Sequence, residues 1–140
     1  MTTSSNNQKS RRQSSRRDGL ASVELAVVLP VMLILVMGTI EVCQRIFLRQ
    51  SAVIVAYEGA RSAVRSTCSN ADVAARCQAM LTQRNVKGAV VTVTPADLLS
   101  QPSGTQIRVR VEVPCASNSP TRFVLQDQGT FSVDATMLRE

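Results

Sequence analysis

The sequence predicts an α+β protein, in which one long N-terminal helix packs on a small antiparallel sheet of about three strands, with one extra short helix. Three observations lead to this prediction. An uncharged run of 16 residues, 25–40, continues into a segment whose apolar residues recur at helical spacing as far as residue 65. Residues 105–114 and 130–137 alternate between apolar and polar side chains, as half-buried antiparallel strands do. Residues 71–84 carry helix-start and helix-stop signals at their two ends.

The first 19 residues form a basic segment that cannot contribute to a folded core. They hold five basic residues and one acid, Asp18, which is +4 of the formal net charge of +6, so residues 20–140 carry only +2. Their Ser, Asn, Gln, Lys and Arg composition predicts disorder. A solvated tail and a removable leader would both have this composition. The residues that follow favour a leader, 1–19.

Residues 20–43 are predicted to form a transmembrane helix. About 20 predominantly apolar residues are needed to span a bilayer, and Glu24 and Glu41 lie near the two ends of this stretch. The basic flank places the N-terminus in the cytoplasm and everything after the span outside it. The apolar run is too long for a cleaved secretory signal, and "MGTIEVCQR" is a poor cleavage region. Pro30, inside the run, is expected to kink the helix.

An amphipathic continuation of the same helix is predicted over residues 44–66. We expect its apolar side to pack on the sheet and its charged side to face solvent. The pattern itself starts at Glu41, and its apolar positions are Val42, Ile46, Val53, Ala56, Tyr57, Ala60 and Val64. The charged positions are Glu41, Arg45, Arg49, Glu58, Arg61 and Arg65.

The rest of the chain, 67–140, is predicted to be a small extracytoplasmic α+β domain. Ser69 or Asn70 would cap a helix over 71–84, and Gly88 would follow its end. Strands are expected at 89–94, 105–114 and 130–137, with a long connection between the last two. On the second strand, Arg108 and Arg110 point to the solvated side.

Composition excludes several classes of function. The chain has no histidine, which removes His-based general bases, His-containing triads and most zinc enzyme sites. It offers no nucleophile–base pair, paired carboxylates or phosphate-binding loop, so we expect no enzymatic activity, no cofactor and no small-molecule substrate. The positive charge belongs mainly to the N-terminus and the aromatic residues are only three Phe and one Tyr, so we expect no nucleic-acid partner.

Three of the four cysteines fall in the predicted extracytoplasmic domain, where disulfides persist. Cys68 with Cys77 is the preferred pair because it closes a short loop around the start of the second helix. Cys115 could pair with either of them instead, because sequence does not fix connectivity. Cys43, at the outer end of the span, is expected to be a small apolar residue. A metal site is not expected, because the chain has no histidine and no C-x-x-C motif.

The segment "GLASVELAVVLP…IEVCQRIFLRQSAVIVAYEGARSAVR" resembles the N-terminal signature of TadE-like proteins of the tight-adherence (Tad/Flp) pilus system. These are similar to type IV pseudopilins, minor pilins with a short basic leader. The resemblance implies that a prepilin peptidase at the bacterial inner membrane removes the leader by cutting after Gly19. Leu20 would then be the new N-terminus and Glu24 its fifth residue. The "EGAR" at 58–61 and the closing "ATMLRE" also look like the family.

The resemblance implies an assembly role for Glu24. An acid within a membrane span is costly, and is a functional candidate for that reason. The new amine on Leu20 lies one helical turn away and could pair with Glu24 in the same chain, whereas the family implies pairing with the amine of a neighbouring subunit. The implied partners are the peptidase, other pilin or pseudopilin subunits and the Tad assembly platform. The alternative is an uncleaved signal anchor that carries an extracytoplasmic binding or structural module, with Glu24 reaching the headgroups.

Overall fold

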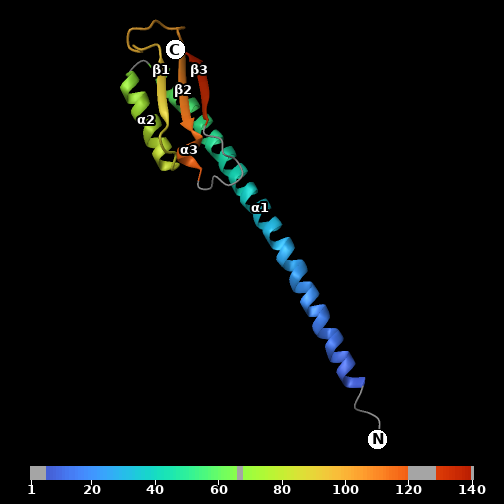
Figure 1. Cartoon of the computed structure of the whole chain (residues 1–140). Helices are drawn as coiled ribbons and strands as arrows, with labels where there is room; N and C mark the ends of the chain where they lie inside the picture. Colours follow the sequence, from blue (N-terminus) through green and yellow to red (C-terminus); the bar gives the residue numbers. More distant parts are fainter. Residues whose placement is uncertain (1–5, 66–67, 120–128, 140) are drawn as a thin grey trace. The chain divides into compact units, whose positions relative to one another are not determined.

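The computed structural model describes residues 6–65, 68–119 and 129–139, with side chains described from Gly19 onward. The elements follow in the order α1 (Asn6–Ala63), α2 (Asn70–Gln83), β1 (Val90–Thr94), β2 (Gln106–Pro114), α3 (Cys115–Asn118) and β3 (Thr130–Leu138) (Figure 1). The predicted α+β class, with a long N-terminal helix and a three-stranded antiparallel sheet, is therefore confirmed. The chain divides into two compact units, Met1–Thr39 and Ile40–Glu140, which are described separately.

The first unit contains the N-terminal part of α1. Helix begins at Asn6, so the predicted disorder of the leader is wrong for its described backbone, 6–18. The physical reason is that this stretch has no Gly or Pro, is rich in Arg, Lys and Gln, and joins a helix that is already formed, so it needs no nucleation of its own. Pro30 lies inside the helix, which continues through it. A kink at this position stays a prediction.

The second unit is built around the sheet, whose strand order is β1-β2-β3 with both pairs antiparallel. Val93, Val109 and Ala135 stand in one row across it. The three strands were predicted to within one residue at each end. The short helix α3 was not predicted, and residues 120–128 of the predicted long connection lie outside the described residues.

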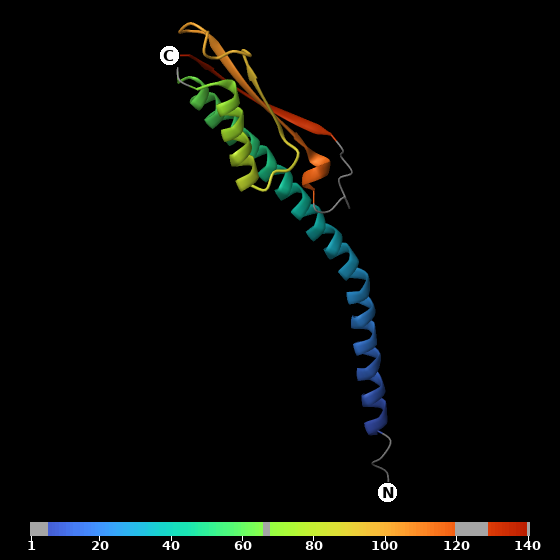
Figure 2. The ribbon, with the colours of Figure 1, turned by 90° about the vertical axis from the view of Figure 1, so that its left-hand side faces the viewer.

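The two faces of the sheet differ in burial as the alternation predicts. On the inner face, Ile107, Val109, Val111 and Val113 are fully buried, and they belong to one core cluster with residues of both helices. Gly59 of α1 faces Cys77 of α2 and Val109 of β2, so α1 packs against both of these elements. Figure 2 shows the two helices on one side of the sheet. The other side carries Arg108 and Arg110, as expected from the sequence.

The buried side of α1 is not the one that the sequence predicted. Ala56 and Ala60 are buried as expected, but Val42, Ile46, Val53 and Tyr57 are each about half exposed. The side that packs in the core instead carries mostly small residues, because small side chains let a helix backbone lie close to a sheet and to a second helix. The buried positions are Leu48, Ser51, Ala52, Val55, Ala56, Gly59, Ala60 and Ala63.

Local hydrogen bonds set the limits of α2. Ser69 is the N-cap: its hydroxyl accepts from the Asp72 backbone N–H, and the Asp72 carboxylate accepts from the Ser69 N–H. This capping box satisfies two backbone donors at the helix start. The helix stops at Gln83, and Asn85 adopts the left-handed conformation with φ of 56°. The predicted helix, 71–84, is therefore confirmed to within one residue at each end, and Asn85, ahead of Gly88, is the left-handed residue that follows it.

A cross-strand ion pair on the outer face predicts a pH dependence. Arg110 donates from Nε and Nη2 to the two carboxylate oxygens of Asp134, at 2.7 and 2.9 Å. These bonds hold the pKa of Asp134 below its ordinary value of 3.8. Because the pKa is lowered in the folded chain, the pair stabilises the fold above that ordinary value, and this stabilisation is lost as the pH falls through the lower, folded value.

We therefore expect an Asp134→Asn chain to be less stable than the parent near neutral pH and to lose less stability on acidification. Urea unfolding of the full chain in detergent micelles, followed by circular dichroism at about pH 6 and about pH 2.5, measures both effects. The pair is partly exposed, so the difference should be small and should shrink in high salt. Identical acid sensitivity of the two chains would contradict this role of the pair.

Candidate functional site

The predicted cleavage position, Gly19, lies in open surroundings. It is inside α1, and a Cβ added to it would meet no atom within 4 Å. Glycine in a helix interior costs about 1 kcal/mol relative to alanine. Packing within the described chain therefore gives no reason for glycine at this position. Gly59 is the opposite case, because its neighbours leave no room for a side chain.

Leu20 and Glu24 lie on the same side of α1, one turn apart. Both side chains are exposed, Leu20 at 71%. Residues four apart on a helix have Cβ atoms about 5–6 Å from each other. A positive charge at the backbone nitrogen of residue 20 would therefore be within reach of this carboxylate, either in the same chain or in a second helix packed along it. The structure thus brings together the predicted cleavage and assembly residues.

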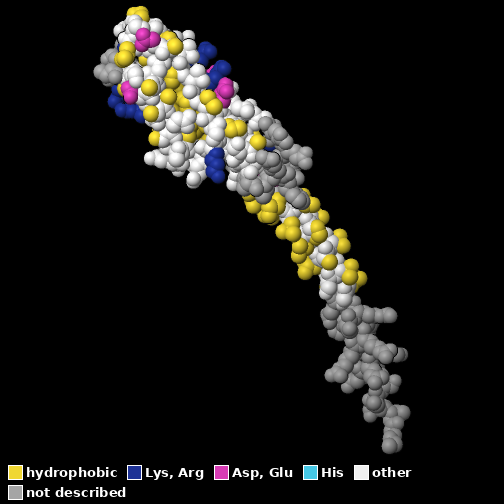
Figure 3. Space-filling model, turned by 60° about the vertical axis from the view of Figure 1, so that its left-hand side comes forward, with side chains coloured by type: hydrophobic (Ala, Val, Ile, Leu, Met, Phe, Trp, Pro, Cys, Tyr) yellow, Lys and Arg dark blue, Asp and Glu magenta, His cyan; other side chains and the backbone are white. Residues whose placement is uncertain are grey.

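An unbroken apolar surface follows these residues. Every large apolar side chain from Leu20 to Met37 is at least one-third exposed. Among the described residues, one helix, Gly19–Ala63, is long and apolar enough to cross a membrane, with a mean hydropathy of 2.6 over its most apolar window and none of that window buried. Figure 3 shows the hydrophobic side chains along this stretch. The helix is compatible with a single-pass membrane anchor.

The two acids at the ends of the predicted span have different surroundings. Glu41 belongs to the second unit and is only 2% exposed, so its own domain shields it. Glu24 belongs to the first unit and is exposed. Of these two carboxylates, Glu24 is the one presented on the apolar surface. The sequence alone could not predict this difference between Glu24 and Glu41, because the burial of Glu41 depends on residues distant in the chain.

All four cysteines are free thiols in the structure, so the preferred Cys68–Cys77 pair is not formed. Cys77 is fully buried beneath Gly59, and its thiol donates weakly to the Val55 carbonyl at 3.8 Å. Burial raises the pKa of the Cys77 thiol, which disfavours the reactive thiolate. Cys43 is exposed, whereas Cys68 and Cys115 are half-buried. The sequence could not foresee that Cys77 faces α1 instead of the loop.

The outer face of the sheet holds an open hollow of about 400 Å³ lined by Thr92, Thr94, Gln106, Arg108 and Arg110. Arg110 is already paired with Asp134, which neutralises much of its attraction for an anion. Within the described residues there is no group of three His, Cys, Asp or Glu side chains that could hold a metal ion. The hollow therefore fits the solvated sheet face that the alternation predicts.

Comparison with known proteins agrees with the sequence resemblance. Residues 19–61 match the family model described as TadE-like protein. The match begins at Gly19 and ends at Arg61, the last residue of "EGAR", so it covers the predicted cleavage position, the apolar run and the amphipathic continuation as far as residue 61. The resemblance to this family is thereby confirmed over these residues. No curated protein matched the chain, and no solved structure matched it.

Proposed function

We propose that this chain is a minor pilin or pseudopilin of the TadE-like type. A prepilin peptidase cuts it between Gly19 and Leu20, and the mature chain takes part in assembling a Tad/Flp-type pilus or secretion machine at the bacterial inner membrane. Its work is structural and not enzymatic. The support is a TadE-like match that starts at the residue after which the cut would fall.

The single observation that carries the proposal is the setting of Gly19. This glycine destabilises the helix locally, and no close packing in the described chain requires a glycine at this position. A peptidase must bind its substrate in an extended form, so a glycine in the helix lowers the free energy needed to unwind the backbone at the cut. Its position between a basic leader and an apolar run is where a membrane-embedded peptidase would reach it.

Cleavage would change the electrostatics at the membrane surface. Removal of residues 1–19 takes away a formal charge of +4 and leaves one ammonium on Leu20, four residues before Glu24. A carboxylate in an apolar environment without a partner is strongly disfavoured. The new ammonium is the nearest opposite charge, whether from the same chain or from a neighbouring subunit. Processing therefore supplies the group that lets Glu24 enter an assembly of packed helices.

The topology follows from the same features. The basic leader stays in the cytoplasm, residues 20–43 cross the inner membrane, and residues 44–140 stand on the outer side, in the periplasm or on the pilus. There the small α+β domain would meet other pilin or pseudopilin subunits, while the membrane helix meets the Tad assembly platform.

The test is the intact mass of the full chain, purified from cells with and without the prepilin peptidase. We expect residues 1–19 to be missing only when the peptidase is present. A Gly19→Val chain should keep its leader in both strains, and its fold should survive because the position has open space around it. Ala26→Val, in the same apolar run, is the matched control and should be processed normally. A parent chain that keeps its leader in both strains would instead indicate an uncleaved, signal-anchored extracytoplasmic module.

A further inference from the structure

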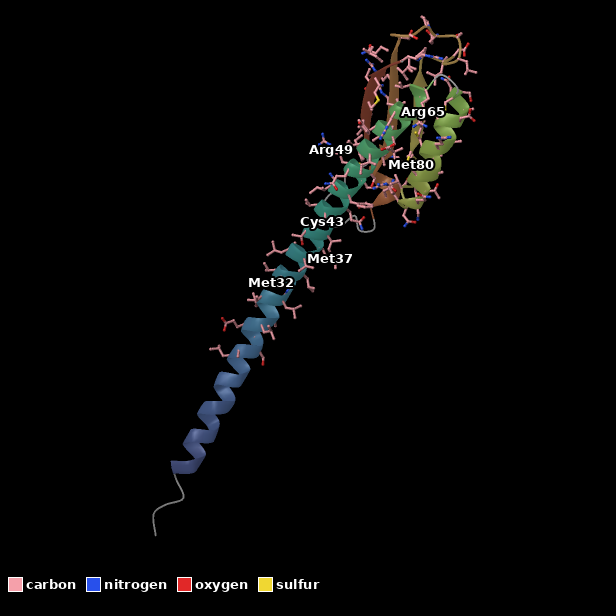
Figure 4. The ribbon with its side chains drawn as sticks, turned by 180° about the vertical axis from the view of Figure 1, so that it is seen from behind. Met32, Met37, Cys43, Arg49, Arg65 and Met80 are labelled. Atoms are coloured by element: carbon pink, nitrogen blue, oxygen red, sulfur yellow. The ribbon has the colours of Figure 1, made fainter. Side chains whose placement is uncertain are left out.

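A second apolar strip lies on the exposed side of α1, beyond the predicted span. We name it the seam and define it as Cys43, Ile46, Gln50, Val53 and Tyr57. Ile46 and Tyr57 are each 52% exposed and Val53 is 46% exposed, while Cys43 and Gln50 are also on the surface. Figure 4 marks Cys43, its first residue, and the neighbouring Arg49. All of it belongs to the second unit, whose own core covers the other side of the helix.

The spacing of the seam is that of a coiled coil. Successive members are three, four, three and four residues apart, which is the pattern of the inward-facing positions in a two-stranded coiled coil. The helix therefore has two apolar sides with different roles. Small residues on one side fit against the sheet and α2, whereas larger residues on the other stay half exposed. Exposed apolar side chains that follow one another along a surface favour an interaction site there.

The seam borders a recess that could receive a side chain of a partner helix. A hollow of about 450 Å³ is lined by Ile46, Arg49, Gln50, Val53 and Ile54. In coiled coils each inward side chain inserts between residues of the facing helix, so a partner helix must meet a hollow of this kind. The recess lies at the centre of the seam, beside its one amide side chain.

We propose that a second copy of this chain packs along the seam, with the two helices parallel. Gln50 points to a copy of itself as the partner. It is the one amide at an inward position, and a primary amide both donates and accepts, so Gln50 can donate to and accept from Gln50 of a parallel copy. A polar residue at a single inward position is a known way to fix register and the number of strands.

The residues that flank the seam also suit a parallel pair of identical helices. In that register Val42 lies opposite Phe47 of the other copy, and the stem of Arg49 lies opposite Ile54. Neither contact opposes two like charges. Two copies anchored by the same membrane helix also share one direction and one plane, which raises their effective concentration. The pairing uses different residues from the Gly19–Glu24 segment and does not depend on leader removal.

Cysteine cross-linking of the full chain in its own membranes tests this proposal. In a Cys68→Ser, Cys115→Ser background, Cys43 is the accessible thiol, because Cys77 is buried and can stay. Copper phenanthroline oxidises two adjacent thiols to a disulfide, with loss of two protons and two electrons to the oxidant. We expect a Cys43-linked dimer of this chain, identified by mass.

A second pair of variants, made with Cys43→Ser, separates the seam from random collision. Tyr57→Cys places a thiol on the seam, and Glu58→Cys places one on the next residue, which is also exposed but turned away from the seam. We expect a dimer from the first and little from the second. Equal yields, no dimer at Cys43, or cross-links only to another protein would each overturn the proposal. In cells that have the prepilin peptidase, a chain that keeps its leader and still forms the Cys43 dimer would reject the pilin-type function while leaving the seam proposal intact.

Discussion

Replacing Gly59 by alanine is expected to lower the free energy of unfolding of the domain at residues 40–140, because overpacking a core usually costs about 1–3 kcal/mol. The added Cβ would lie 2.5 Å from the Cys77 sulfur and 3.2 Å from Cγ1 of Val109, so α1, α2 and β2 would have to move apart. Alanine is the better helix former by about 1 kcal/mol, and the expected loss is what remains after that gain.

Amide hydrogen exchange at β2 in the full chain, held in detergent micelles, measures this change, because the protection of core strands follows global stability. Gly19→Ala is the matched control: it makes the same substitution in the same helix but in open space, so it should not destabilise the domain. A Gly59→Ala chain as stable as the parent would contradict this prediction and show that the core rearranges around the added methyl group without loss of stability.

Replacing Cys77 tests whether its sulfur is the atom that the new methyl group of Gly59→Ala meets. Cys77→Ala alone should destabilise by leaving a small cavity. Combined with Gly59→Ala, it should cost less than the sum of the two single changes, because the new methyl then occupies part of the space that the sulfur left. Strict additivity would mean that the loss at Gly59 comes from the Val109 side or from the helix backbone.

This packing gives a physical meaning to the "EGAR" motif. Glu58 and Arg61 are exposed, while Gly59 and Ala60 are buried at the meeting point of α1, α2 and the sheet. The small residues of the motif determine how closely α1 approaches α2 and the sheet, and the charged residues keep the outer side of the helix in contact with solvent. The motif that supports the family resemblance is therefore, in this chain, a packing device at its centre.

The strands could be predicted from sequence because an alternating pattern such as "QIRVRVEVP" fixes both the strand and its buried side. The side of α1 that packs in the core could not be predicted in the same way. Val42, Ile46 and Val53 are more apolar than Ala52 or Ala60, so hydrophobicity favours the wrong side of α1, and only close approach to the sheet explains why small residues are inside. The same limit applies to Cys77, whose neighbour Val55 is 22 residues away in sequence.

The candidate site was more accessible to sequence reasoning, because Gly19, Leu20 and Glu24 are local to one helix. Their spacing along the chain fixes their spacing in space wherever the backbone is helical. Sequence could not distinguish the two glutamates, since the shielding of Glu41 is a tertiary effect. That difference directs the functional test to Glu24.

A Glu24→Ala chain is expected to lose its leader normally, insert in the membrane at least as well as the parent, and fail to enter pilus or secretion complexes. An acidic residue costs about 2.5–3.5 kcal/mol at the centre of a span on insertion scales and less near its end, where Glu24 lies, so removing the carboxylate should not impair insertion. Failed assembly therefore could not be attributed to poor insertion. It would follow from an ammonium on Leu20 left without its opposite charge among packed helices.

Two variants make this test specific. Glu24→Gln keeps the size and hydrogen-bonding ability of the side chain but removes its charge, so it should fail as Glu24→Ala does if ion pairing matters. Glu58→Gln makes the same change at an exposed position of α1 outside the predicted span and should assemble normally. The intact mass of each chain reports leader removal, and the amount recovered with sheared pili or purified complexes reports assembly. Normal recovery of Glu24→Ala would contradict the proposed role of this carboxylate. Normal recovery of Glu24→Gln alone would show that a hydrogen bond from an uncharged side chain is enough for assembly and that an ion pair is not needed.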